Sequence, residues 1–322
     1  MNLPLRPLTL ALAGTLLAAP LAVTAVAQAA EPEQVRFSVP AWPGVTVKTA
    51  LAETLLETLG YEVDQEELGS TITYQALTQE EVDVFLAAWL PAQQAMFDAT
   101  LEKGAIVDLG NNVDGARLGF AVPTYVYDAG VTTAEDLADE EIAEKLDRTI
   151  YSIEVGSGMS DTLNGAVEND TYGLGDWDLS ETSTPGMLSA VDAAIDREEW
   201  VVFAGWTPHW MNIEYDVKFL TDTQDMWGPE GGRSDVRTLV STAFSESSPN
   251  ATLLLDQLSF TADDQSAMIR GFSYEEQEPE DVALAWLRDN PAKVKAFLDG
   301  VTTREGEPAW PAVQQALEIP DA

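Results

Sequence analysis

The stretch VRFSVPAWPGVTVKTALAETLLETLG (Val35 to Gly60) contains a complete strand–turn–helix unit. Apolar residues occupy alternate positions from Val35 to Val39, which indicates a strand. From Val47 onward the apolar residues recur three or four positions apart, which predicts an amphipathic helix, and Gly60 supplies a C-terminal stop. A strand that leads directly into a helix is the building block of α/β folds with parallel strands.

The same unit recurs along the chain. VDVFLA (82–87) reads as a buried strand, and PAQQAMFDATLEKG (91–104) as a helix with Pro91 in its first turn. TIYSI (149–153) and WVVFAGW (200–206) read as further strands, each near a predicted helix. We therefore predict an α/β fold with mainly parallel sheets.

A long predicted strand over 116–126, broken at Pro123, suggests that the chain crosses into a second domain. A second strand, DVRTLVSTAF (235–244), suggests its return. An insertion of about 115 residues between two halves of an α/β domain produces two lobes with a cleft, where small ligands commonly bind. We predict lobe I from residues 30–120 and 236–322, and lobe II from residues 121–235.

The N-terminal residues 1–29 have one Arg, an apolar stretch and the small-residue site Ala27-Gln28-Ala29, which predicts a cleaved signal peptide and export. The chain has no cysteine, which argues against a lipid anchor, a disulfide framework and a thiolate metal site. We expect a protein of the periplasm. No later stretch approaches the roughly 18 uncharged apolar residues of a spanning helix.

The formal net charge is −39, and the acidic residues are dispersed along the chain rather than gathered in one tail. This charge makes nucleic acid and anionic membranes poor partners. We interpret the acidic residues as a solvated surface that favours solubility at high salt.

Three tryptophans end predicted strands in the same local context, which is an apolar run, a small residue and then tryptophan. They are Trp42, Trp89 and Trp206. Open α/β sheets bind ligands at the carboxyl ends of their strands, so the three indoles can surround one ligand. Quaternary ammonium groups have no N–H to donate, and cation–π contact of about 0.5 to 2 kcal/mol per aromatic face is their main specific attraction. The alternative is that these residues fill the core between the domains.

Candidate anion-binding groups lie close to these tryptophans in the sequence. Gly44 and Val45 lie where the first helix begins, so their backbone N–H groups are free at the positive end of its dipole. The loop EVGSGMS places Ser157 and Gly158 in a similar turn of lobe II. The only histidine, His209, follows Trp206 closely and can donate an N–H to a carboxylate. A cage for a cation beside a site for an anion describes a receptor for a zwitterion.

The segments VPAWPGV, TYQALTQEEVDVFLAAWLP, IEVGSGMS, FAGWTPHWMN and AWLRDNPAKVKAFLDGVT resemble the glycine betaine, proline-betaine and choline substrate-binding proteins of ABC importers. The resemblance covers residues 34–318. It implies a two-lobed type II periplasmic binding protein that closes on its ligand and delivers it to a membrane permease with ATPase subunits. By position, the three tryptophans match the family's aromatic cage. The residues that match positions holding the other end of the ligand are Gly44, Val45, Ser157, Gly158 and His209.

The chain departs from the choline binders of this family at three places. They carry Asp two residues after the first cage tryptophan, where this chain has Gly44. They also carry Tyr near Leu118 and an Asn-Asp pair where this chain has Ser157-Gly158. These differences favour glycine betaine or a related betaine over choline. Carnitine, proline betaine and dimethylsulfoniopropionate stay open.

Other classes of function fit the sequence less well. A secreted hydrolase would have to use the single histidine, and the chain has neither a G-x-S-x-G elbow nor an H-E-x-x-H motif. A sugar receptor needs many hydrogen-bonding side chains near its aromatic platforms, and the tryptophan segments offer few. We expect a monomeric binding protein without a cofactor or metal.

Overall fold

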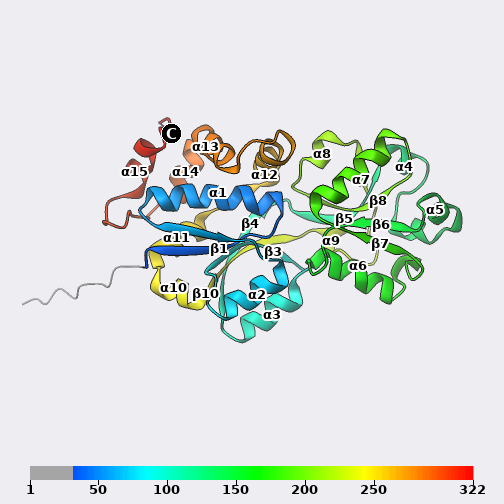
Figure 1. Cartoon of the computed structure of the whole chain (residues 1–322), viewed down its shortest axis with the longest axis horizontal. Coiled ribbons are helices and arrows are strands. Elements are labelled where there is room, and N and C mark those ends of the chain that lie inside the picture. Colours follow the sequence, from blue (N-terminus) through cyan, green and yellow to red (C-terminus); the bar gives the residue numbers. More distant parts are fainter. Residues whose placement is uncertain (1–31, 322) are drawn as a thin grey trace, which may run out of the picture. The chain divides into compact units, whose positions relative to one another are not determined.

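The computed structural model describes residues 32–321, and the predicted signal peptide lies outside them. These residues form two mixed sheets with helices on both faces of each (Figure 1). The predicted strand 35–39 and the helix that follows it are present as β1 (Gln34–Ser38) and α1 (Pro43–Thr58). This confirms the α/β fold.

The sheet of lobe I has six strands. Their spatial order is β11 (Phe260–Thr261), β4 (Ile106–Asp114), β10 (Asp235–Ser241), β3 (Val84–Leu90), β1 and β2 (Glu62–Glu66). Helices α1, α12 (Ala262–Ile269) and α13 (Pro279–Asp289) lie on one side of this sheet, and α2 (Ser70–Thr78), α3 (Gln94–Glu102) and α10 (Thr242–Ser247) on the other (Figure 1). The chain also forms α11 (Pro249–Gln257), α14 (Pro291–Phe297), α15 (Ala309–Ala316) and a π-helical turn, η3 (Arg270–Tyr274).

The sheet of lobe II has five strands, in the order β7 (Asp178–Glu181), β6 (Thr149–Ser152), β8 (Val202–Thr207), β5 (Arg117–Pro123) and β9 (Val217–Phe219). Helices α6 (Gly158–Glu168) and α7 (Thr184–Asp196) lie on opposite sides of it (Figure 1). The shorter helices are α4 (Thr124–Asp128), α5 (Glu140–Lys145), α8 (Met211–Glu214), α9 (Pro229–Gly232), η1 (Ala134–Ala138) and η2 (Thr171–Gly173).

The sheets are less parallel than predicted, because β5 and β10 each run antiparallel to both neighbours. Each is the first strand after the chain crosses from one sheet to the other. The crossings lie side by side, since the Ser234 N–H donates to the Ala116 carbonyl at 3.0 Å. The predicted lobe boundary at 120/121 would cut through β5, so we propose to place it near Gly115, between β4 and β5.

Buried leucines fix α1 on the sheet of lobe I. Val47, Leu51 and Leu55 are fully buried on one face of the helix. Burial of each such side chain stabilises the fold by about 1.5–3 kcal/mol. The prediction for Pro91 was wrong: α3 begins only at Gln94, and Pro91 lies in the preceding turn after a cis peptide bond.

Candidate functional site

A cavity lies where the carboxyl ends of β1, β3 and β8 meet, and both lobes line it. Lobe I contributes Trp42, Pro43, Gly44, Val45, Lys48, Ala87, Trp89, Ala92, Gln93 and Gln265. Lobe II contributes Leu118, Ile153, Ser157, Gly158, Met159, Trp206 and Pro208. The cavity therefore brings together every predicted site residue except His209.

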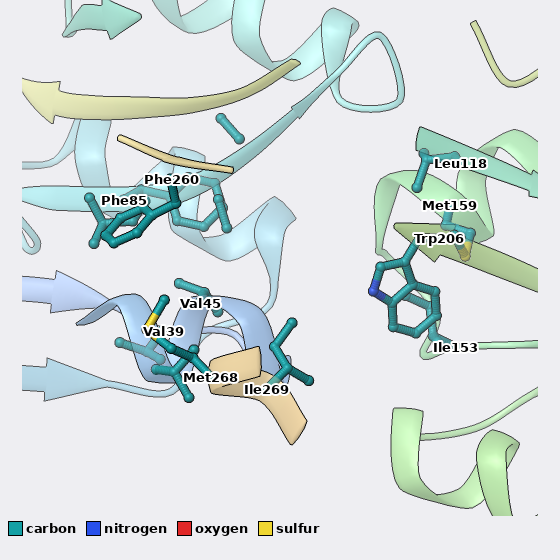
Figure 2. Packing of buried hydrophobic residues seen from close by; sticks show 14 of the residues in the cluster. Val39, Val45, Phe85, Leu118, Ile153, Met159, Trp206, Phe260, Met268 and Ile269 are labelled. Carbon is teal, nitrogen blue, oxygen red and sulfur yellow. The ribbon is translucent and has the colours of Figure 1, made fainter. Parts of the chain in front are cut away.

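The strand ends place the three tryptophans. Trp42 follows β1 and is the N-cap of α1, Trp89 is near the end of β3, and Trp206 is near the end of β8. Figure 2 shows Trp206 projecting from lobe II beside Ile153 and Met159. Leu118 lies directly opposite Trp206 in the sheet, because the antiparallel β5 starts at the edge where β8 ends.

Trp42 is held by a contact between the lobes. Its indole Nε1–H donates to the Glu154 carboxylate of lobe II. The carboxylate adds negative charge beside a ring whose face is already the negative part of its quadrupole. This hydrogen bond therefore strengthens the attraction of the Trp42 indole for a cation.

The first turn of α1 offers free backbone donors. Pro43 has no N–H, and the N–H groups of Gly44 and Val45 come too early in the helix for an intrahelical acceptor. A side chain cannot be added at Gly44 without movement, because its Cβ would lie 2.5 Å from Gln265 Nε2. That amide donates to the Gly44 carbonyl at 2.9 Å, while the buried Gln265 Oε1 finds no donor among residues 32–321. The first turn of α1 thus carries no carboxylate.

Lys48 is a residue that the sequence reasoning missed. It lies one turn after Gly44 on α1, only 1% exposed, and its Nζ donates to the Leu86 carbonyl at 2.8 Å and to Asn112 Oδ1 at 2.6 Å. Burial lowers its pKa to about 7. Its spacing from the buried leucines could have revealed it, because Leu51 and Leu55 follow at three and seven positions on the same helix face.

The polar groups of the loop that precedes α6 in lobe II form hydrogen bonds within that loop. Ser157 Oγ donates to the Glu154 carbonyl at 2.9 Å and accepts from the Ser160 N–H at 3.1 Å, so the hydroxyl caps α6. Gly158 lies against lobe I, where a Cβ would lie 2.8 Å from the Ala92 carbonyl oxygen. Gly158 therefore permits a close approach of the lobes.

His209 lies behind the cavity rather than in its lining. Its ring centroid is 4.9 Å from that of Trp206, and its Nδ1 accepts from the Met211 N–H at 3.2 Å. The proton is therefore on Nε2, which is buried and has no partner among the residues the structure describes. Burial lowers the His209 pKa to about 3, so the imidazole is neutral at physiological pH.

Within residues 32–321, nowhere do three or more His, Asp and Glu side chains gather in a way that could hold a metal ion. None of the helices in that range combines the length and hydropathy needed to cross a bilayer.

The chain is similar in sequence and fold to substrate-binding proteins of ABC transporters. Residues 33–289 match the family model described as the substrate binding domain of ABC-type glycine betaine transport systems. The glycine betaine/carnitine transport binding protein GbuC of Listeria monocytogenes is 31% identical over 55% of this chain, and the alignment spans 58% of that protein. A choline-binding protein of an ABC transporter, solved with choline, superposes with a TM-score of 0.85 at 33% identity over 88% of this chain and 98% of its own. Lactococcal OpuAC, solved with glycine betaine in its closed form, superposes with a TM-score of 0.74 at 26% identity over 82% of this chain and 99% of its own. This chain therefore belongs to the family of substrate-binding domains of ABC-type glycine betaine transport systems.

Proposed function

We propose that this protein captures glycine betaine or a related betaine between its lobes and delivers it to the permease and ATPase subunits of an ABC importer. The observation that carries the proposal is a cavity with three tryptophans, a free helix N-terminus and the buried amine of Lys48, and with no carboxylate in the lining that residues 32–321 form. We further propose that the mature protein works in the periplasm as a monomer.

The trimethylammonium group belongs between the three indoles. Trp42 and Trp89 come from lobe I and Trp206 from lobe II, so closure of the lobes completes the cage. Desolvated cation–π contacts of about 0.5 to 2 kcal/mol per face add up over several faces. The Glu154 carboxylate bonded to Trp42 adds to the attraction.

The carboxylate end belongs at the first turn of α1. The N–H groups of Gly44 and Val45 and the helix dipole favour an anion there, and the start of α6 at Ser157 and Gly158 presents a second helix N-terminus across the cavity. The third predicted group, His209, lies behind the cavity lining, so we propose that it supports the Trp206 indole rather than donating to the carboxylate.

Choline and carnitine are the alternatives within the family. The choline-binding relative is the more similar of the two solved structures above, but in this chain Gly44 packs against Gln265 and the described residues place no carboxylate in the cavity lining. Choline would therefore bring an uncompensated positive charge next to Lys48. A betaine or carnitine brings its own carboxylate, which favours these ligands over choline.

The test is calorimetric titration of the mature protein and of Trp89→Ala with glycine betaine. Loss of one cage face and its contact area lowers the affinity by about 10-fold to 100-fold. Trp310→Ala, a tryptophan of α15 outside the cavity, is the matched control and keeps the affinity. A folded Trp89→Ala variant that binds as tightly as the control contradicts the cage.

A further inference from the structure

Lys48 differs from all other residues around the cavity. It is the only charged side chain in the lining formed by the described residues. It lies one helical turn below Gly44, under the backbone N–H groups proposed to hold the ligand's carboxylate. A lysine that is 1% exposed is rare in proteins unless it is paired with an acidic group.

The hydrogen bonds of Lys48 involve only neutral acceptors. Its Nζ donates to the Leu86 carbonyl and to Asn112 Oδ1, and within residues 32–321 no carboxylate lies within ion-pair distance. Asn112 is itself fixed, because its Nδ2 donates to the Leu86 carbonyl at 3.0 Å and to Thr238 Oγ1 at 2.9 Å. Two acceptors satisfy both N–H groups of a neutral amine, whereas an ammonium has a third N–H left over.

We propose that Lys48 is a specificity-determining residue of this cavity, whose ammonium recognises an anionic group of the ligand. This inference rests on the function proposed above and names the residue that makes the site selective for zwitterions. A buried unpaired charge is unfavourable until a counter-charge arrives, and a ligand carboxylate supplies one. A ligand that carries only a positive charge is repelled by this ammonium and binds less tightly.

Protonation of Lys48 then depends on the ligand. Burial lowers its pKa to about 7 in the empty cavity, and a bound carboxylate raises it again. Above pH 7 the protein therefore takes up a proton as glycine betaine binds, and the affinity falls as the pH rises. The affinity for tetramethylammonium, which has no carboxylate, rises with pH, because deprotonation removes the positive charge of Lys48 that repels this cation.

The titratable groups near Lys48 do not account for such a change between pH 7 and 9. His209, across the cavity, has a pKa of about 3, and burial raises the pKa of Tyr74, whose hydroxyl donates to Gln93. The charged groups on the elements packed around α1 are paired with an opposite charge, hydrogen-bonded to a neutral side chain or exposed at the surface. The ion pairs are Asp83–Arg36, Asp108–Arg237, Asp264–Lys293 and Glu214–Arg270. The Glu53 carboxylate accepts a hydrogen bond from Gln65. The exposed groups are Glu57, Glu280 and Asp281.

The experiment is calorimetric titration with glycine betaine at pH 7 to 9 in buffers of different ionisation enthalpy. We expect uptake of about one proton per ligand at pH 8 and an affinity that falls by up to about tenfold per pH unit. Lys48→Met removes the proton uptake and lowers the affinity at pH 7 by about tenfold or more, while its affinity for tetramethylammonium is retained or increased. Lys295→Met, which removes a surface lysine of α14, behaves like the unchanged protein.

The outcomes separate this inference from the function on which it rests. Binding of glycine betaine without proton uptake, or with equal affinity in Lys48→Met, overturns the role of Lys48 and leaves the proposed function standing. If the variant does not fold, the proton uptake of the unchanged protein decides alone. Absence of glycine betaine binding by the unchanged protein at every pH overturns the proposed function itself.

Discussion

The two walls of the cavity differ in chemistry. Lobe I contributes the first turn of α1, the buried ammonium of Lys48 and the side-chain amides of Gln93 and Gln265. Lobe II contributes an almost wholly apolar surface of Leu118, Ile153, Met159, Trp206 and Pro208. The hydroxyl of Ser157, its one polar side chain in the lining, is already used to cap α6.

This difference indicates a division of labour. Under the proposed function, lobe I fixes the charge and orientation of the ligand, and lobe II covers it with an apolar surface that completes the cage and excludes water. Contacts outside the cavity join the lobes, for example the Arg270–Glu214 ion pair and the hydrogen bond from Trp210 Nε1 to Ser273 Oγ at 3.1 Å. Water exclusion strengthens the charge interactions that lobe I makes.

The largest expected effect is on the free energy of unfolding of the protein, and it comes from Lys48 in the polar wall. The Lys48 pKa is about 7 in the fold and 10.5 in the unfolded chain. The unfolded chain therefore binds more protons between these values, and the free energy of unfolding rises as the pH increases from 7 to 10.5. Lys48→Met is expected to be the more stable protein at pH 7, and its advantage in unfolding free energy is expected to decrease by roughly 4 kcal/mol between pH 7 and pH 10.5.

Urea unfolding of the two ligand-free proteins across this pH range measures the gap. A gap that does not change with pH would mean that the Lys48 ammonium is not buried in the empty cavity.

The role of the apolar wall can be tested with a substitution that keeps lobe II from approaching lobe I closely. Gly158→Ala places a Cβ 2.8 Å from the Ala92 carbonyl oxygen, so the lobes cannot close fully. We expect an affinity for glycine betaine about 30-fold lower, which corresponds to about 2 kcal/mol. The matched control on the same helix is Gly165→Ala, where a Cβ meets no atom within 4 Å. Equal affinities of the two variants in calorimetry would show that lobe II does not close as tightly as described.

The histidine behind the apolar wall predicts a smaller effect on the acid side. The His209 pKa is about 3 in the fold and 6.5 when solvated, so its contribution is complete above pH 6.5 and is lost as the pH falls. At pH 5.5 this loss is about 1.4 kcal/mol. His209→Gln should show a shallower decrease of unfolding free energy between pH 6.5 and 5.5. Identical slopes in urea unfolding would place the imidazole in contact with water.

The smallest effect tests the one acidic group of lobe II that touches the cage. Glu154→Gln keeps an acceptor for Trp42 Nε1–H but removes the negative charge behind the ring. We expect about twofold to threefold weaker binding of glycine betaine at low salt, and a smaller difference at high salt because ions screen the charge. Glu168→Gln, at the exposed end of α6, is the control. A difference that grows with salt would exclude this electrostatic role.

Much of the arrangement follows from local patterns in the sequence. Apolar runs that end in tryptophan predicted the ends of β3 and β8, whereas β1 already stops at Ser38, before Trp42. The rule that ligands bind at carboxyl strand ends predicted that the three tryptophans line one cavity. The helix start at Pro43 equally predicted free N–H groups at Gly44 and Val45.

The other features depend on contacts that no local pattern contains. The helical spacing to Leu51 places Lys48 on the buried face of α1, but its neutral partner Asn112 comes from β4, 64 residues away in the sequence. Gln265 reaches Gly44 from 221 residues away in the sequence. The antiparallel direction of β5 and β10 depends on how the chain crosses between the sheets. Such long-range pairings are set by tertiary packing rather than by propensity.

The most direct test of the division between the walls is calorimetric titration of the mature protein at pH 7 with glycine betaine and, separately, with choline. Both ligands carry the same trimethylammonium group, so the proposed cage interacts with both, and mainly the polar wall of lobe I tells them apart. We predict that glycine betaine binds at least about tenfold more tightly than choline. Equal affinities, or tighter binding of choline, would contradict the account of Lys48 and the first turn of α1.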